Sequence, residues 1–465
     1  MEWLSPMDAS FLHIEAPNNP MHIGGVSIFE GPAPPLERLQ EMVEGKLDAV
    51  PRYRQKVRFV PLGVARPVWV DDPHFNLSYH LRHSALPSPG SDDILHRTAA
   101  RIFAQRLDRR KPLWEIWMVE GLSDKRWALL SKVHHCMVDG VSATDLMTVM
   151  FDDSPAPATA PPWEPGPEPT SAELVVRSLS HQLSNPSEQL RVMRSATRRP
   201  RAALAQARDV LRGMRSSVGL LRPLERSSLT GPVGPHRTWS TAYLPLDEIK
   251  AIRRALGGTV NDVVLTVVSG GLRELLSARG EHVDGRTIRA LVPVSVRRPG
   301  ERGVYNNRVS AMFAELPVGI LDPVARLDVV RAQMDDLKQS KQAVAGDVLT
   351  SLSGFAPPLI LDLAGRLAAR SPSLGVQTGV TNVPGPQHAL QTLDRTLLQS
   401  YPFVPVIGNV RISIAIFSYN GGMYFGVTAD YDSSNDIDIL TRGIETAAAQ
   451  LLELAGDRQV GALEV

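Results

Sequence analysis

The sequence predicts an α/β protein with two domains joined by a long middle segment. Three observations lead to this prediction: a length of 465 residues, a proline-rich stretch within the chain, and mixed strand-like and helix-like segments on both sides of it. A chain of this length usually folds as two or three domains. Seven of the fifteen residues in 155–169 are proline. Because proline is excluded from helix interiors and central strands, we expect an extended linker there.

Before the linker, strand-like and helix-like patterns alternate. Short apolar runs bounded by turn residues predict strands, and apolar residues spaced three and four apart predict helices. The expected strands are 22–29 and 127–133, and the expected helices are 36–50 and 92–107. Mixed elements in one block indicate an N-terminal α/β domain, which we place at residues 1–154.

After the linker, the same mixture continues. A buried strand is expected at 288–296. A hairpin is expected where two alternating segments, 410–419 and 423–431, flank Asn420-Gly421, a residue pair typical of two-residue turns. The expected helices are 246–256, 261–279, 323–345 and 436–454.

A middle segment, residues 155–235, separates the first block from a C-terminal domain that we place at residues 236–465. It contains an unusually basic stretch, residues 191–226. Ten arginines and two acidic residues lie in 191–226, although the formal net charge of the whole chain is only +1. Between Pro200 and Pro223, arginines recur every seven residues beside an apolar stripe, which predicts an amphipathic helix.

Three roles remain open for the helix expected at 200–222. It can pack on its own protein with a solvated arginine face, as most amphipathic helices do. It can lie at a membrane surface with its arginines near anionic lipid headgroups. Nucleic acid is the third partner class, disfavoured because 191–226 contains no aromatic residue that would stack on bases.

Composition excludes several protein classes. With 43% hydrophobic and 21% charged residues, the chain resembles ordinary globular proteins and neither a disordered nor a fibrous one. The longest apolar runs, such as 263–268 and 412–417, are far shorter than the ~18 residues needed to span a bilayer. The first residues lack the basic start and apolar core of a secretory signal. The single cysteine, Cys136, excludes intrachain disulfides and cysteine-rich metal sites, so we expect an intracellular protein.

The sharpest local feature is the string His134-His135-Cys136-Met137-Val138-Asp139-Gly140. A histidine at a strand end is well placed as a general base, because its ordinary pKa of about 6.5 lets it accept and return protons at neutral pH. Adjacent histidines of an extended chain point to opposite sides and chelate one metal poorly. His135 and Asp139 could meet across the turn, but the sequence names no third ligand, and we expect no metal. Cys136 is either a nucleophile or, as we expect, a side chain packed behind the turn.

The complete His-His-x-x-x-Asp-Gly string at 134–140 resembles the active-site motif of CoA-dependent acyltransferases. This superfamily includes chloramphenicol acetyltransferase, carnitine acyltransferases and the condensation domains of peptide synthetases. Within it, the chain most resembles the bacterial wax ester synthase/diacylglycerol acyltransferase family. Further stretches that match this family, in the expected order between residue 5 and about 455, are Met-Asp-Ala-Ser-Phe at 7–11, Pro-Met-His-Ile-Gly-Gly at 20–25, Pro-Leu-Trp-Glu at 112–115, Asn-Asp at 261–262, Pro-Val-Ser-Val-Arg at 293–297 and Asn-Val-Pro-Gly-Pro at 382–386.

The resemblance implies a fold and a catalytic centre. It implies two domains of mixed sheets flanked by helices, with an active-site tunnel at the domain interface. His135 would be the general base, with His134 beside it. Asp139, next to Gly140, would brace the turn by pairing with Arg297.

The resemblance also assigns roles to residues outside the histidine string. Asn261 is the candidate for stabilising the oxyanion or positioning a substrate, and its alternative role is that of a helix N-cap. Trp114 either contacts a substrate or anchors the core, and we favour a Pro-Leu-Trp turn that supports the histidine turn. The residues implied near the substrates are Pro112, Leu113, Trp114, Asp262, Arg297, Asn382, Pro384 and Gly385.

The implied activity is O-acyl transfer from long-chain acyl-CoA to diacylglycerol, to a long-chain alcohol, or to both. No metal or redox cofactor is implied, because acyl-CoA is itself a substrate. We expect a cytoplasmic protein that associates peripherally with the inner membrane face or with lipid droplets. Two alternatives remain. A condensation-type transferase would take its acyl group from a carrier-protein thioester, which the Pro-Leu-Trp and Asn-Val-Pro-Gly-Pro stretches disfavour. A non-catalytic lipid-surface protein on the same fold is disfavoured by the intact histidine string.

Overall fold

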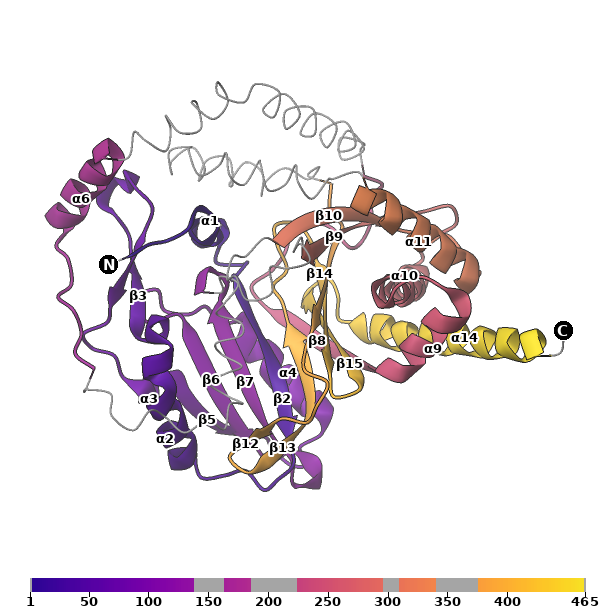
Figure 1. The fold of residues 1–465 in the computed structure, drawn as a ribbon, viewed down its shortest axis with the longest axis horizontal. Helices are drawn as coiled ribbons and strands as arrows, with labels where there is room; N and C mark the ends of the chain where they lie inside the picture. The colour runs from indigo at the N-terminus through magenta and orange to yellow at the C-terminus, as the bar shows by residue number, and fades with distance from the viewer. Residues whose placement is uncertain (1, 138–162, 185–223, 296–308, 340–374, 464–465) are drawn as a thin grey trace.

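The computed structural model describes residues 2–137, 163–184, 224–295, 309–339 and 375–463. Within these ranges the protein is a mixed α/β structure, as the sequence predicts, with two six-stranded mixed sheets and one small three-stranded sheet (Figure 1). The basic segment expected to form a helix at 200–222 lies outside the described residues.

The N-terminal half is built around a sheet with the strand order β12-β13-β2-β7-β6-β5. β5 and β6 run parallel, and the other neighbouring pairs run antiparallel. The strands from the first part of the chain are β2 (His22–Phe29), β5 (Leu81–Ala85), β6 (Trp114–Glu120) and β7 (Trp127–His134). β7 is a buried strand because its apolar residues, such as Ala128, Leu129 and Leu130, have no exposed surface. It ends at the first histidine of the predicted active-site string.

Two strands of this sheet come from the far end of the chain. β12 (Gln391–Thr392) and β13 (Arg395–Phe403) lie beside β2 at the bottom of Figure 1. β13 pairs antiparallel with β2, from Leu397 opposite Phe29 to Phe403 opposite Gly24. Part of the segment 236–465 therefore completes the edge of the N-terminal sheet.

The second sheet has the order β10-β9-β11-β14-β15-β8. Its strands are β8 (Arg237–Pro245), β9 (Ile288–Ser295), β10 (Val309–Leu316), β11 (Thr378–Pro384), β14 (Ile412–Tyr419) and β15 (Gly422–Asp430). The helices at the right of Figure 1 are α9 (Leu246–Leu256), α10 (Val260–Ala278), α11 (Pro323–Gln339) and α14 (Ile437–Leu463). The apolar face of α10 packs with α14 and the sheet in one continuous core.

The two halves are in close contact. α4 (Asp92–Ala104) lies against β8, where His96 Nε2 and Thr241 Oγ1 are 3.2 Å apart. β13 crosses β15 so closely that a Cβ atom at Gly426 would collide with the carbonyl oxygen of Pro402. Glycine permits this approach because it has no side chain.

The small sheet, in the order β1-β4-β3, covers the other end of the N-terminal half. Its strands are β1 (Glu2–Trp3), β3 (Gln55–Arg58) and β4 (Val68–Asp71). This part of the chain also contains the helices α1 (Pro6–Ile14), α2 (Leu36–Lys46), α3 (Leu77–His80) and α6 (Ser171–Ser184). The structure describes the predicted linker from residue 163 onward, and residues 163–170 form neither a helix nor a strand. They are attached to this sheet through Gly166 N, which donates to Asp71 Oδ2 at 2.9 Å, and through the Lys56–Glu168 ion pair at 3.1 Å.

Several predicted elements end earlier than their patterns suggest. Helix α4 stops at Ala104, although its apolar pattern predicts a helix to residue 107. The reason is Lys132 of β7, whose buried ammonium group binds the carbonyl oxygens of Ile102 and Gln105. A cation at a helix C-terminus satisfies carbonyl groups that lack partners within the helix. β2 and α9 have the predicted bounds, and the predicted turn at Asn420 and Gly421 has positive φ angles of 42° and 79°.

No single described helix is both long and apolar enough to cross a bilayer; α9 and α10 pass that test only as a pair, which is bent by 102°.

Candidate active site

The histidine turn, residues His134–Met137, begins at the last residue of β7 and continues as the short 3-10 helix η5 (His135–Met137). Its backbone is held from two sides. The amide of His134 donates to the carbonyl oxygen of Leu113 at 2.9 Å, and the amide of His135 donates to the carbonyl oxygen of Met21 at 2.8 Å. The turn is therefore fixed between the Pro-Leu-Trp stretch and the residue that precedes β2.

His135 has an apolar and partly open environment. Its ring stacks on Phe11 of α1, with ring centroids 3.9 Å apart and planes inclined by 23°. The residue keeps partial solvent access, whereas its Nδ1 atom is buried without a hydrogen bond to any described residue. Burial lowers the pKa of His135 below its ordinary value. The imidazole is therefore neutral at pH 7, the form that accepts a proton.

His134 is buried and differently bound. Its Nδ1 atom accepts a hydrogen bond from the amide of Cys136 at 3.1 Å. The proton of the neutral ring is thus assigned to Nε2, which lies 3.6 Å from Glu15 Oε1. Burial lowers the pKa of His134 to about 4, although the Glu15 charge opposes that shift. His134 is therefore a buried, neutral residue, and the role of His135 as the reactive histidine stays a prediction.

Glu15 is the residue of this site that the sequence did not single out. Glu15 directly follows α1, and its side chain is only 1% exposed. Arg109 binds Oε2 through Nε at 2.9 Å and Nη2 at 2.6 Å, and Arg106 Nη2 binds the same oxygen at 3.0 Å. Oε1 accepts from the amide of Met21 at 3.3 Å and lies 3.6 Å from His22 Nε2.

The charge of Glu15 is set by opposing effects. Burial by itself would raise the pKa of the Glu15 carboxyl, whereas attraction by His134 and Arg109 and hydrogen bonds from both arginines lower it. The net shift is downward. Since only the arginines carry a permanent charge at pH 7, we attribute the anionic state of Glu15 mainly to Arg106 and Arg109.

The Pro-Leu-Trp stretch supports the histidine turn from inside the core. Pro112, Leu113 and Trp114 are all buried. The Trp114 indole donates to the carbonyl oxygen of Tyr53 at 2.8 Å and stacks on His80 at 4.5 Å. These contacts correspond to the core-anchor alternative, and the link to the reacting centre is the Leu113 carbonyl group rather than the indole.

Two asparagines from separate motifs meet in the C-terminal half. Asn382 Nδ2 lies 3.4 Å from Asn261 Oδ1 and donates to it. Asn261 is not the N-cap of α10, because Thr259 has that position and forms a capping box with Asp262. Asp262 is therefore engaged at its own helix start, where its carboxylate accepts from the Thr259 amide at 2.8 Å. No contact between described residues joins either asparagine to His135.

The remaining site residues predicted from the sequence lie at or just after the end of β11 or outside the residues that the structure describes. Pro384 is exposed, and the Gly385 amide donates to the Ser418 carbonyl oxygen at 2.9 Å. A Cβ atom at Gly385 would collide with the ring of Phe417, so glycine is required for this packing. The residues Asp139, Gly140 and Arg297 lie outside the described ranges, so the brace between Asp139 and Arg297 stays a prediction.

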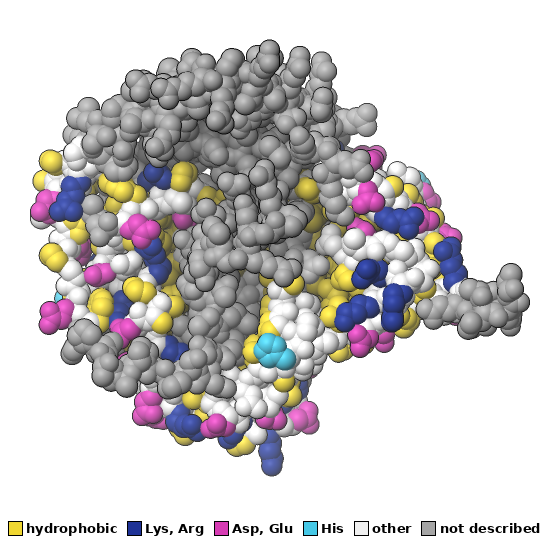
Figure 2. Space-filling model, viewed as in Figure 1, with side chains coloured by type: hydrophobic (Ala, Val, Ile, Leu, Met, Phe, Trp, Pro, Cys, Tyr) yellow, Lys and Arg dark blue, Asp and Glu magenta, His cyan; other side chains and the backbone are white. Residues whose placement is uncertain are grey.

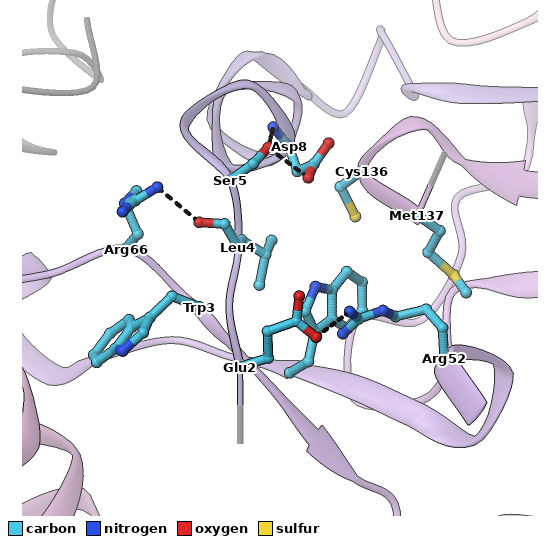
Figure 3. Close-up of a pocket in the computed structure, with 10 residues that line it drawn as sticks. Glu2, Trp3, Leu4, Ser5, Asp8, Arg52, Arg66, Cys136 and Met137 are labelled. Carbon is cyan, nitrogen blue, oxygen red and sulfur yellow. Dashed lines mark hydrogen bonds and ion pairs between the residues drawn. The ribbon is translucent and has the colours of Figure 1, made fainter. Parts of the chain in front are cut away.

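Cys136 faces a polar cavity of about 150 Å³ behind the histidine turn (Figure 3). In this view the thiol points into the space beside Asp8 of α1, with Arg52 and Met137 on the adjacent wall. Burial, followed by the negative charge of Asp8, raises the pKa of the Cys136 thiol well above its ordinary value. A thiol kept protonated is a poor nucleophile, which supports the packing role.

The described residues of the site offer an imidazole that can transfer a proton. His22, His134 and Glu15 form the densest cluster of possible ligands, yet Nε2 of His22 accepts from the Leu107 amide at 3.3 Å and Nδ1 of His134 from Cys136. Across the described ranges, no three or more histidine, cysteine, aspartate or glutamate side chains are arranged to hold a metal ion.

Comparison with protein families and known proteins places this geometry in context. The family model described as wax ester synthase/diacylglycerol acyltransferase catalytic domain matches residues 4–264, and the model for the WS/DGAT C-terminal domain matches residues 305–452. A probable diacylglycerol O-acyltransferase of Mycobacterium tuberculosis, tgs1, is 36% identical over 466 residues, covering 99% of this chain and 98% of the relative. A second one, tgs2, is 31% identical over 464 residues, covering 98% of this chain and all of the relative.

Solved structures share the fold. The wax ester synthase/diacylglycerol acyltransferase from Marinobacter aquaeolei VT8 superposes with a TM-score of 0.66 at 24% identity, covering 98% of this chain and 100% of that one. The first condensation domain of the calcium-dependent antibiotic synthetase superposes with a TM-score of 0.61 at 17% identity, covering 98% and 96%. These similarities confirm the predicted two-domain acyltransferase fold.

The buried histidines predict a loss of stability in mild acid. Burial lowers the pKa of both His80 and His134 to about 4, whereas the unfolded chain protonates them at about pH 6.5. Between these pH values the unfolded state binds more protons, so the free energy of unfolding falls by roughly 1.4 kcal/mol per pH unit for each histidine. Urea unfolding at pH 7.5, 6.0 and 5.0 measures this, and His80→Gln should reduce the slope. Unchanged stability between pH 7.5 and 5.0 would contradict the buried neutral state.

Proposed function

The chain belongs to the wax ester synthase/diacylglycerol acyltransferase family, and from this premise we propose that it transfers a long-chain acyl group from acyl-CoA to an acceptor hydroxyl, with His135 as general base. The proposed acceptors are diacylglycerol, giving triacylglycerol, and long-chain alcohols, giving wax esters. Relatives with about one third identity over nearly their whole length are named as diacylglycerol O-acyltransferases, which supports the first acceptor.

The observation that carries this proposal is the state of His135. Its imidazole is neutral because burial lowers its pKa, it keeps partial solvent access, and it is fixed by the Phe11 ring and the Met21 carbonyl group. A general base needs a free lone pair, a defined position and access to the substrate proton. The neighbouring His134 has the buried, hydrogen-bonded environment of a support and lacks such access.

The proposed reaction proceeds without a covalent acyl-enzyme. His135 removes the proton from the acceptor hydroxyl as the alkoxide oxygen attacks the thioester carbonyl carbon. The carbon–oxygen bond forms, the tetrahedral oxyanion collapses, and the carbon–sulfur bond breaks. The imidazolium then returns the proton to the CoA thiolate. A histidine base and a thiolate leaving group suffice for these steps, so we propose acyl-CoA as substrate and no resident cofactor.

The asparagine pair is the proposed source of hydrogen-bond donors for the oxyanion. Because Asn261 Oδ1 already accepts from Asn382, the amide group of Asn261 is oriented with its two N–H donors available on the other side. Preorganised donors of this kind stabilise charge that develops in a transition state. We propose that Asn261 donates to the oxyanion and that Asn382 holds it in position.

A condensation-type transferase is the second candidate, since condensation domains share the fold. The two candidates differ in the acyl donor, which is either free acyl-CoA or a thioester on a carrier protein. Purified protein is incubated with palmitoyl-CoA and either dipalmitoylglycerol or hexadecanol, and lipid products are separated by chromatography. Ester formation with CoA release supports the first proposal. Transfer only from a carrier-protein thioester, or no ester from any donor, overturns it.

We further propose that the protein is cytoplasmic and binds an anionic membrane or lipid-droplet surface through the basic segment 200–222. Its acceptors are nearly insoluble in water, so they must be taken from a lipid phase. On the described part of the face in Figure 2, basic and acidic side chains are interspersed, whereas the basic segment concentrates arginine. Each arginine near an anionic surface contributes roughly 1 kcal/mol of binding, which salt weakens.

The membrane proposal predicts salt-sensitive binding to vesicles. Wild type should co-sediment with anionic vesicles at low salt and less at high salt. A variant with serine at Arg201, Arg208, Arg215 and Arg222 should co-sediment less with anionic vesicles, while neutral vesicles serve as the control. Equal binding of the two proteins to anionic vesicles would return the segment to the packed-helix alternative.

Histidine variants test the assignment of the base. His135→Ala should lower turnover by at least about 10²-fold, the usual scale for loss of a general base, and His134→Ala should be less damaging. Because protonation removes the base and burial lowers the pKa of His135, kcat/KM should fall in acid with a midpoint below pH 6.5. A largely active His135→Ala together with an inactive His134→Ala would show that the base is wrongly assigned.

A further inference from the structure

We propose that Glu15 is a positioning residue for acyl transfer, a buried carboxylate that fixes the backbone and the ring environment of His135. The proposal rests on the function proposed above. Glu15 does not reach the reacting atoms. It acts through the segments that hold the base, which it joins from the C-terminal end of α1.

The Glu15 carboxylate accepts hydrogen bonds at both oxygens and is paired with two arginines. Its Oε2 atom accepts hydrogen bonds from three N–H groups of Arg106 and Arg109, and hydrogen bonds between charged groups are stronger than neutral ones. Its Oε1 atom faces the amide of Met21 and the Nε2 atoms of His22 and His134. Removal of one arginine would leave a buried charge without its partner, so the arrangement tolerates little displacement.

A first connection to His135 runs through two backbone hydrogen bonds. Glu15 Oε1 accepts from the Met21 amide at 3.3 Å, and the Met21 carbonyl oxygen accepts from the His135 amide at 2.8 Å. Met21 therefore stands between the carboxylate and the base. Displacement of Met21 moves the backbone of the general base directly.

A second connection runs through helix α1. The Glu15 amide closes this helix by donating to the Phe11 carbonyl oxygen at 3.1 Å, and Arg109 Nη2 donates to the Leu12 carbonyl oxygen at 2.8 Å. The Arg109 guanidinium thus joins the carboxylate to the helix end. Since Phe11 stacks on the His135 ring at 3.9 Å, loosening of this helix end also frees one face of the base.

A third connection runs through His134. The Nδ1 lone pair of the neutral His134 ring accepts from the Cys136 amide, and the Nε2 atom lies 3.6 Å from Glu15 Oε1, an electrostatic contact without a hydrogen bond. Glu15 thereby favours the tautomer that keeps the Cys136 hydrogen bond, which closes the turn after His135. Burial is the main cause of the lowered pKa of His135, so we expect Glu15 to act on the position of the base rather than on its proton affinity.

Three variants test this role by steady-state kinetics with palmitoyl-CoA. Glu15→Gln keeps the shape but removes the charge, and Glu15→Asp keeps the charge on a shorter arm. Glu281→Gln is the matched control, because Glu281 is also a carboxylate bound by an arginine but lies far from Glu15 in the sequence. Hydrogen bonds from Ser228 and Arg286 lower the pKa of Glu281 more than burial raises it. Glu15→Gln should lower kcat by ~10- to 100-fold, as expected when a catalytic group is displaced by about 1 Å.

The pattern of results separates positioning from general destabilisation. We expect Glu15→Gln to leave the KM for palmitoyl-CoA and the acid midpoint of the pH profile unchanged. Glu15→Asp should retain a higher kcat than Glu15→Gln. Glu281→Gln should retain the full kcat but have a lowered melting temperature. Full kcat in Glu15→Gln overturns the proposal. A shifted acid midpoint also overturns it, because Glu15 would then act on the proton affinity of the base.

A measurement that needs no turnover distinguishes this proposal from the proposed function. Hydrogen exchange of the Met21 and His135 amides reports the backbone connection directly. Faster exchange at both amides in Glu15→Gln, but not in Glu281→Gln, supports the positioning role even if wild type forms no ester, in which case only the proposed function fails. Unchanged exchange at both amides overturns the positioning role.

Discussion

One buried carboxylate connects the segments on which the catalytic turn depends. Glu15 binds two arginines that follow α4, the backbone at the start of β2 and the end of α1, and it faces the buried ring of His134. Each of these segments is remote from the histidine string in sequence. A charge in the core is costly unless it is paired and hydrogen-bonded. The segments that bind Glu15 can therefore move little, and they hold the neighbouring histidine turn in a fixed position.

The sequence predicts those helices and strands whose bounds are set by residues within the element itself. β2 and α9 begin and end as predicted because their apolar spacing and their turn residues lie within the elements themselves. The early end of α4 was not predictable, because the cation that binds its last carbonyl groups, Lys132, comes from another strand. The pairing of β13 with β2 was likewise hidden, because no local pattern in 395–403 records which sheet edge it will join.

The same distinction applies to the site. The histidine string is local, and its position at the end of a buried strand was predicted correctly. The meeting of Asn261 with Asn382 follows from the matched motifs only once the fold is known. Phe11 lies inside a stretch that the sequence had matched and Glu15 lies between two such stretches, yet neither was assigned a role. The sequence shows an acidic residue between these two stretches and two arginines at 106 and 109. Only the fold shows that the carboxylate is buried and that the arginines bind it.

In the proposed division of roles, His134 is a neutral support and leaves proton transfer to His135. Long-range proton–nitrogen NMR spectra of protein with nitrogen-15-labelled histidine measure this directly, with a His134→Gln variant assigning the signals. The His134 ring should carry its single proton on Nε2 and remain neutral from pH 8 to about pH 5, since burial lowers its pKa to about 4. A His134 ring that titrates near pH 6.5, or that carries its proton on Nδ1, would contradict the division of roles between the two histidines.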